Sequence, residues 1–418
     1  MRGKTVLWLI LTVVGALTFV SFNSTWAADA PAKIKAGLMF GMTGAASPIG
    51  PVQLDGAKLA IKEINEAGGV KIGGKKVPLE FDVRDDETKV DVSIRRFREL
   101  VNDQKVHFVV GSTFASIAAA LNEETKRLPV VYLPVNVAPI TSFPKSEMAE
   151  TAFCMHGNDY SIGFAGASYI VNKLGHKNVF FFAPAYGFGW NQWKGAKDAL
   201  EKFGAKYEYM EAPVGTADFT SYLLKIEEKK PDIVMMAQWG TDAIGVLKQA
   251  YETGLKKKTK IWFNWMTNVF GSGVPADAIE GVNSLMSWYY DMSGFADPAI
   301  VNAAKAFTDK FVKEYKYPPD PYSAAAYMAI KEAARAIENA QSVDPKAISK
   351  AILSNPKFDS VRGPGTWRVD HQPLFKYGAF VVTGKGEKER KDKKWDIVKI
   401  VGAYTGDDYI PAVSTFGY

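Results

Sequence analysis

The residues best placed to do chemistry lie at a strand-to-helix turn, in the stretch VVGSTFASIAAA from Val109 to Ala120. An apolar run ends at Gly111, and the hydroxyl residues Ser112, Thr113 and Ser116 lead into an alanine-rich helical run. In open α/β sheets, ligands bind beyond the carboxyl ends of the strands, where a helix N-terminus presents free N–H groups and about half a positive charge. The turn therefore predicts either a site for an anion such as a carboxylate, or hydroxyl groups that only cap the helix.

Other residues could in principle do acid–base or metal chemistry. Asp85 and Asp86 follow an apolar run, and we interpret them as helix caps rather than catalytic carboxylates. The chain lacks G-x-x-x-x-G-K-[ST], H-E-x-x-H and G-x-S-x-G, and GMTGAASPIG lacks the G-x-G-x-x-G spacing. The four histidines stand singly, without metal-ligand spacing: His107, His156, His176 and His371. The sequence therefore predicts no enzyme, no metal site and no cofactor.

Composition and charge further restrict the class of protein to which the chain can belong. The 418 residues carry a net charge of +6 and no long basic block, which argues against nucleic-acid binding. Arg2 and Lys4 precede an apolar run at residues 6–20, and small residues follow at Ala27 and Ala30. This layout predicts a cleavable signal peptide over residues 1–27, with cleavage after Ala27 or Ala30, and hence a periplasmic protein. The run is shorter than the ~20 residues of a membrane span.

Cys154 is the only cysteine, so the chain has no internal disulfide. We interpret FCMH as a strand with a buried thiol, because free cysteine is usually buried. Stability must then come from a hydrophobic core, which the chain is long enough to build.

The elements that position the turn alternate between apolar strands and amphipathic helices. Strands are expected at Ile34–Met42, PLEFDVRDD, HFVVG and PVVYLPV, with a helix near Val52–Ala67. The alternation restarts with NVFFFAPA, AKYEYMEAPV, PDIVMMAQW and KIWFNWM, which predicts a second α/β unit. Near-continuous apolar strands are typical of parallel sheets covered on both faces. Three helices (Pro298–Tyr315, Tyr322–Ala340 and Pro345–Leu353), a hairpin and a solvated charged turn at Lys385–Lys394 complete the chain.

The order IKAGLMFGMTG, NEAGGV, LEFDVRDDET, FVVGS and PVVYLPV resembles the leucine/isoleucine/valine-type periplasmic binding proteins of ABC transporters. NVFFFAPAYGFG, PDIVMMAQWGTDA and GPGTWRVDHQ extend the resemblance over nearly the whole mature chain. It implies an α/β, type I periplasmic binding protein fold: two doubly wound parallel-sheet lobes joined by three crossing strands. The crossings would fall near His156, Ser287 and Trp367. The N-terminal lobe would then comprise residues 31–156 and 288–366, and the C-terminal lobe residues 157–287 and 367–418.

The resemblance also implies a ligand site in which the turn after the third strand holds a carboxylate. The ligand-binding residues would be Thr113, Phe114, Ala115, Ser116, Asn136, Val137, Tyr186, Trp239 and Trp265.

Several of these positions depart from the family pattern. Ala115, with Ser116 beside it, replaces a hydroxyl residue, and Val137, after Asn136, replaces a threonine. The glutamate that pairs with a ligand ammonium is replaced at about Trp265.

Two interpretations of the ligand follow. Aromatic walls and a missing glutamate favour a carboxylic acid or amide with an apolar or aromatic body and no α-ammonium, since an unpaired buried ammonium costs several kcal/mol. Alternatively, the tryptophans are core residues and Asp85, Asp242 or a backbone carbonyl serves an ammonium.

The predicted function is therefore capture of a small ligand by hinge closure and delivery to an inner-membrane ABC permease, by a monomer. A ligand-sensing ectodomain or subunit with the same fold is the alternative, and a secreted α/β enzyme is the weaker one.

Overall fold

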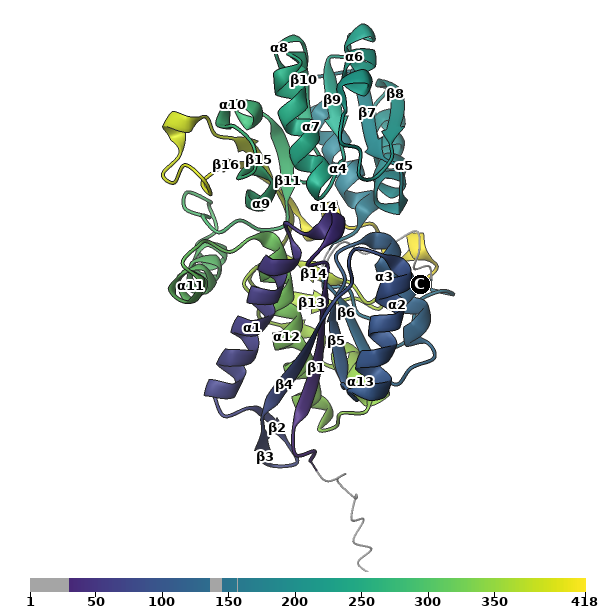
Figure 1. Cartoon of the computed structure of the whole chain (residues 1–418), viewed down its shortest axis with the longest axis vertical. Helices are drawn as coiled ribbons and strands as arrows, with labels where there is room; N and C mark the ends of the chain where they lie inside the picture. The colour runs from purple at the N-terminus through teal and green to yellow at the C-terminus, as the bar shows by residue number, and fades with distance from the viewer. Residues whose placement is uncertain (1–29, 136–144, 156) are drawn as a thin grey trace, which may run out of the picture.

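The computed structural model describes residues 30–135, 145–155 and 157–418. They form two α/β lobes, which lie one above the other in Figure 1. Among these described residues, no helix is long and apolar enough to cross a membrane. The expected signal peptide at residues 1–27 and the predicted positions Asn136, Val137 and His156 lie outside the described residues.

The lower lobe in Figure 1 is built on a four-stranded parallel sheet in the order β4-β1-β5-β6. The strands β1, β5 and β6 are almost entirely buried, as parallel strands covered by helices must be, whereas the edge strand β4 is partly exposed. The strands are β1 (Ile34–Phe40), β4 (Leu79–Asp85), β5 (Phe108–Gly111) and β6 (Val131–Pro134). The helices are α1 (Gly50–Glu66), α2 (Val90–Arg98), α3 (Ala115–Thr125), α12 (Pro321–Ala340) and α13 (Pro345–Ser354), with α11 (Pro298–Tyr315) beside them. The hairpin β2 (Val70–Ile72) and β3 (Lys75–Val77) extends from its far end.

The upper lobe contains a seven-stranded sheet in the order β16-β15-β11-β10-β9-β7-β8. Five strands are parallel: β7 (Asn178–Pro184), β8 (Lys206–Ala212), β9 (Ile233–Met236), β10 (Lys260–Phe263) and β11 (Asn283–Met286). The added hairpin β15 (Tyr377–Gly384) and β16 (Val398–Thr405) pairs antiparallel, so this sheet is mixed rather than purely parallel. Its helices are α4 (Asp159–Asn172), α5 (Gly187–Lys202), α6 (Thr220–Glu228), α7 (Thr241–Glu252), α8 (Leu255–Lys258), α9 (Asn268–Gly271), α10 (Ala276–Ile279) and α14 (Gly406–Tyr409).

A small sheet of β12 (Lys357–Phe358), β13 (Gly365–Trp367) and β14 (Pro373–Phe375) precedes the passage into the upper lobe. The Trp367 indole donates a hydrogen bond of 2.6 Å to Glu332 of α12, which fastens this sheet to the lower lobe. After this small sheet, the C-terminal part of the chain enters the seven-stranded sheet of the upper lobe at β15. The expected lobe boundaries after residues 156, 287 and 366 stay a prediction.

Cys154, the single cysteine of the chain, is buried, as expected. The expectation of a regular strand around it is wrong. Phe153 and Met155 donate backbone hydrogen bonds to Tyr132 and Pro134, so the segment follows β6 without continuing the sheet.

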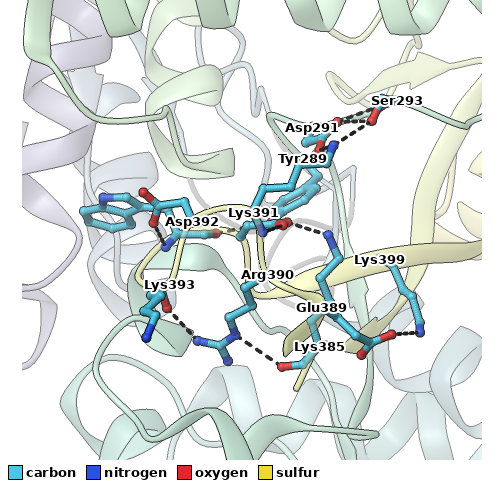
Figure 2. A network of polar contacts seen from close by, with 12 residues as sticks. Tyr289, Asp291, Ser293, Lys385, Glu389, Arg390, Lys391, Asp392, Lys393 and Lys399 are labelled. Atoms are coloured by element: carbon cyan, nitrogen blue, oxygen red, sulfur yellow. Dashed lines mark hydrogen bonds and ion pairs between the residues drawn. The ribbon is translucent and has the colours of Figure 1, made fainter. Parts of the chain in front are cut away.

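The charged stretch Lys385–Lys394 links β15 to β16, and Figure 2 shows that it is held against neighbouring segments. Lys391 forms an ion pair of 2.8 Å with Asp291, and Lys385 forms one of 2.6 Å with Asp396. The Lys385 side chain is 12% exposed and that of Asp396 is 1% exposed. The expectation of a solvated turn is therefore confirmed for residues 387–389 and 391–394, which are exposed, and is wrong for the buried pair of Lys385 and Asp396.

Candidate functional site

The strand-to-helix turn at the start of α3 is not capped by its hydroxyl groups. Phe114 is the N-cap residue of α3 and makes no side-chain capping bond. The Ser112 hydroxyl hydrogen-bonds the Tyr132 hydroxyl at 2.6 Å, and the Thr113 hydroxyl donates to Gln53 Oε1 at 2.6 Å. The capping alternative is therefore wrong, because both hydroxyls point to the core of their own lobe. The first N–H groups of α3 have no side-chain cap, which is the arrangement that favours an anion.

A close approach of two strands fixes the turn. Gly111 has a φ of +150°, and a Cβ there would lie 1.9 Å from the carbonyl oxygen of Met39 in β1. Glycine is required here because any side chain would push β5 away from β1, and the turn would move with it.

Five aromatic residues meet in front of this turn, and we call them the aromatic cluster. The Phe114 ring stacks on Tyr186 with centroids 4.3 Å apart and planes 10° apart, and it lies 5.9 Å from the ring of Trp239. The Trp239 indole donates a hydrogen bond of 2.7 Å to the Tyr322 hydroxyl. Burial raises the pKa of Tyr322 well above its usual range, against hydrogen bonds from Trp239 and Trp265.

The aromatic cluster spans both lobes. Phe114 precedes α3 and Tyr322 opens α12 in the lower lobe, whereas Tyr186, Trp239 and Trp265 follow β7, β9 and β10 of the upper lobe. Trp239 and Trp265 are only 4% and 2% exposed, so they are buried and also lie where the lobes meet. The predicted residues Phe114, Tyr186, Trp239 and Trp265 are thus brought together, with Thr113, Ala115 and Ser116 adjoining them in the α3 turn.

Tyr322 is a member of the cluster that the sequence did not reveal. It stands at the start of an alanine-rich helix, where the preceding Asp320 forms a capping box with Ser323. That pattern signals a helix start and carries no information about a ligand.

Two backbone contacts also join the lobes. Gly240 has a φ of +63°, and a Cβ there would lie 2.2 Å from the carbonyl oxygen of Ala45 in the other lobe. The Val269 amide of α9 donates a hydrogen bond of 3.1 Å to Asp320. The lobes are therefore in direct contact at the residue after Trp239 and at Asp320, two positions before Tyr322.

Asp85 and Asp86 do not cap α2, whose N-cap residue is Lys89, so that interpretation is wrong. Asp85 instead accepts hydrogen bonds from the Met42 amide at 3.0 Å and from the Thr43 hydroxyl at 2.7 Å. Burial acts to raise the pKa of Asp85, but these hydrogen bonds outweigh it and the pKa is lowered. Asp85 therefore holds the loop that carries Ala45 to the other lobe.

Asp86 is almost fully buried, and burial raises its pKa to about 6. Its Oδ1 accepts the Thr88 amide at 2.8 Å, and its Oδ2 has no hydrogen-bond partner among the described residues.

Asp242, the other carboxylate proposed for an ammonium, already accepts the Gly215 amide at 2.9 Å. A third carboxylate, Asp159, lies in the first turn of α4 and is fully buried. Nothing in the local pattern singles it out, because NDY predicts only the start of a helix.

A cavity of about 670 Å³ lies elsewhere, lined by Lys145, Lys346, His371, Tyr418 and their neighbours. Within the described part of the chain, no three His, Cys, Asp or Glu side chains are grouped so as to hold a metal ion.

Comparison with known proteins agrees with this architecture. Residues 33–388 match the family described as periplasmic binding protein. The chain belongs to that family. Periplasmic binding proteins similar to it include the leucine-specific-binding protein of Salmonella typhimurium, 25% identical over 359 residues that cover 85% of this chain and 91% of the relative. The Leu/Ile/Val-binding protein homolog 8 of Brucella abortus is 26% identical over 369 residues, covering 84% and 88%.

Solved periplasmic binding proteins share the fold. One from Burkholderia mallei has a TM-score of 0.80 at 23% identity and covers 91% of this chain and 96% of its own. A solute-binding protein of an ABC transporter from Rhodopseudomonas palustris, solved with benzoate, has a TM-score of 0.76 at 20% identity and covers 90% and 99%. The resemblance to leucine/isoleucine/valine-type proteins is thus confirmed, as is the two-lobed fold. At the level of its class, the protein is a periplasmic solute-binding protein.

Proposed function

We propose that this periplasmic binding protein captures a small carboxylate-bearing solute between its lobes and delivers it to an inner-membrane ABC permease. The observation that carries the proposal is the uncapped N-terminus of α3 beside the stacked rings of Phe114 and Tyr186. The residues proposed to contact the ligand are Thr113, Phe114, Ala115, Ser116, Asn136, Val137, Tyr186, Trp239 and Trp265.

The N-terminus of α3 supports binding of the carboxylate. The side chains of Ser112 and Thr113 are committed to Tyr132 and Gln53, so they leave the first amides of the helix for a ligand. A carboxylate there would accept hydrogen bonds from these amides and would lie at the positive end of the helix dipole, without needing a lysine or arginine.

The inter-lobe contacts support capture by closure. The contacts Phe114–Tyr186 and Trp239–Tyr322 each join residues of opposite lobes, so they exist only when the lobes are together. A ligand that adds contacts to both lobes would shift the population toward the closed form by its differential affinity for that form.

The aromatic cluster supports a ligand with an apolar or aromatic body, because flat rings bury large apolar areas and stack on one another. Two such ligand classes occur among the similar proteins: one relative is named for leucine, and one solved structure contains benzoate.

The expected signal peptide at residues 1–27 supports a periplasmic location. The permease would contact the rims of both lobes and so sense closure, and the binding protein would act as a monomer without changing its solute chemically. Recovery of the bound solute unchanged after prolonged incubation would check that the protein does not alter its solute chemically.

Tryptophan fluorescence of the mature protein tests the proposal. The chain has ten tryptophans, and Trp239 and Trp265 lie in the aromatic cluster. We expect a saturable change with leucine or with benzoate- and cinnamate-type acids, and none with benzylamine, which lacks a carboxylate. A response to benzylamine, or the absence of a response to every acid, would contradict a carboxylate site.

A further inference from the structure

Asp320 is a buried carboxylate that joins the two lobes. It is the N-cap residue of α12 in the lower lobe and is 0% exposed. Oδ1 accepts the Tyr322 amide at 3.0 Å within its own lobe, and Oδ2 accepts the Val269 amide of α9 at 3.1 Å from the upper lobe. Beside this bond, the Asn268 side chain donates to the carbonyl oxygen of Pro319 at 3.2 Å. The starts of α9 and α12 therefore meet at a hydrogen-bonded contact, at the level of Figure 1 where the lobes touch.

No opposite charge neutralises this carboxylate. None of the described lysine, arginine or histidine side chains pairs with Asp320. The upper-lobe residues that face it, 267–269, are a threonine, an asparagine and a valine, which do not titrate. On its own side its charge acts on Tyr317 and Tyr322, whose pKa values are raised, chiefly by burial, so both stay neutral. Asp55 of α1 accepts the Tyr317 hydroxyl at 2.6 Å, within the lower lobe.

Separation of the lobes changes the surroundings of this carboxyl group. In the closed form burial raises the pKa of Asp320 to about 6, against the hydrogen bonds from Tyr322 and Val269 and the nearby Thr267 hydroxyl. Once α9 moves away, water reaches Oδ2 and the bond to Tyr322 remains. A solvated carboxyl group with one such bond ionises near its usual value, at about pH 4. Between these two values, the closed form binds a proton that the open form does not hold.

Three other buried carboxyl groups near the lobe contact lack this dependence. Asp86, Asp159 and Asp242 each accept their hydrogen bonds from residues of their own lobe. These bonds do not have to break when the lobes separate, whereas Asp320 loses the bond from Val269. Asp320 is therefore the acid whose environment follows closure.

We propose that lobe closure takes up a proton at Asp320, so that the protein holds its solute more tightly as the pH falls. The proposal rests on the closure mechanism proposed above and concerns its regulation. The neutral acid can be buried at the lobe contact at little cost, whereas the ionised carboxylate must be desolvated each time the lobes close. A rise in pH ionises Asp320 and shifts the population toward the open form, which releases the solute.

Calorimetric titration of the unaltered protein measures this uptake. Leucine, benzoate and cinnamate are the probes, and each is titrated at several pH values in two buffers that differ in ionisation enthalpy. We expect binding to take up about half a proton per protein at pH 6 and almost none at pH 8, and affinity to rise roughly fourfold from pH 8 to pH 5.5. Binding without proton uptake at pH 6 would overturn this inference and leave the proposed function standing. Failure of all three probes to bind would overturn both.

Asp320→Asn assigns the proton to this residue. The amide keeps an acceptor for the lobe contact and is a good N-cap for α12, but it does not titrate. We expect the variant to bind with the same affinity from pH 8 to pH 5.5 and to lose the proton uptake at pH 6. Asp320→Ser, which also caps a helix without a charge, takes its place if the amide variant does not fold.

Asp86→Asn is the matched control. Burial raises the pKa of Asp86 to about 6 as well, but its hydrogen bond from Thr88 lies within the lower lobe. Proton uptake on binding should therefore be the same in this variant as in the wild-type protein. Uptake that persists in Asp320→Asn, or that disappears equally in Asp86→Asn, would overturn the proposal.

Discussion

Phe114 of the lower lobe lies flat on Tyr186 of the upper lobe, with ring centroids 4.3 Å apart. At this separation the two rings are in van der Waals contact, so nothing can lie between them. A solute can therefore enter only when the lobes separate. The same pair that closes the site must open to admit the ligand, which makes the inter-lobe contacts part of the binding equilibrium.

The hydrogen bond from Trp239 to Tyr322 is expected to stabilise the closed form. Trp239→Phe and Tyr322→Phe should each weaken ligand binding about fivefold, the value of one buried hydrogen bond. The double variant should lose much less than the product of the two effects, because both changes remove the same bond. Calorimetric titration of the four proteins gives this comparison, and fully additive losses would argue against a shared contact.

Gly240→Ala is expected to obstruct closure. The Cβ would lie 2.2 Å from the carbonyl oxygen of Ala45, and the φ of +63° is unfavourable for alanine. Ligand-induced compaction, measured by small-angle X-ray scattering, should be reduced and affinity should fall by roughly tenfold or more. Gly245→Ala on α7 is the control, because its Cβ would meet Phe219 at an ordinary 3.5 Å. Unimpaired compaction in Gly240→Ala would show that the two lobes do not approach here.

Asp86→Asn is expected to stabilise the protein at high pH. The pKa of Asp86 is raised to about 6 by burial, so its ionised form is disfavoured in the folded state. The cost is greatest above pH 6, shrinks as pH falls toward 4, and vanishes once the unfolded chain is also protonated. The amide should therefore raise the free energy of unfolding by up to roughly 3 kcal/mol at pH 8, and by little at pH 3.5. Urea unfolding at both pH values checks this, and a destabilised variant at pH 8 would refute it.

Asp85→Asn should behave in the opposite way. The pKa of Asp85 is lowered, so its contribution to stability is present above the unfolded pKa and is lost as pH falls through the lowered value. The substitution should cost about 1 kcal/mol at pH 8, through weaker bonds to Met42 and Thr43. The same unfolding experiments measure this cost. A variant as stable as wild type at pH 8 would mean that these bonds contribute nothing to the loop.

Local patterns were enough to predict most of the helices and strands and the place of the turn before α3. The helix expected at Pro298–Tyr315 is α11 with the same bounds, and the turn after Val110 lies at the lobe contact as predicted. These features follow from periodicity, glycine placement and motif order, which act over short distances along the chain.

The residues that were missed depend on contacts between distant segments. Tyr322 joins Trp239 across 83 positions of sequence, and Asp159 meets Asn191 across 32. A tyrosine in an alanine-rich helix and an aspartate in a first helical turn are unremarkable locally. Only its burial, and the lack of a hydrogen-bond partner for Oδ1 among the described residues, distinguish Asp159 from an ordinary first-turn acid.

The central claim is that the solute is held by its carboxylate at the start of α3 between the two lobes. A crystal structure of the mature protein with the tightest-binding acid from the fluorescence titration tests it most directly. We predict carboxylate oxygens within hydrogen-bonding distance of the first amides of α3, with the body of the solute against the aromatic cluster. A solute bound instead in the cavity beside Lys346 and Tyr418, or with its carboxylate turned away from α3, would contradict the account.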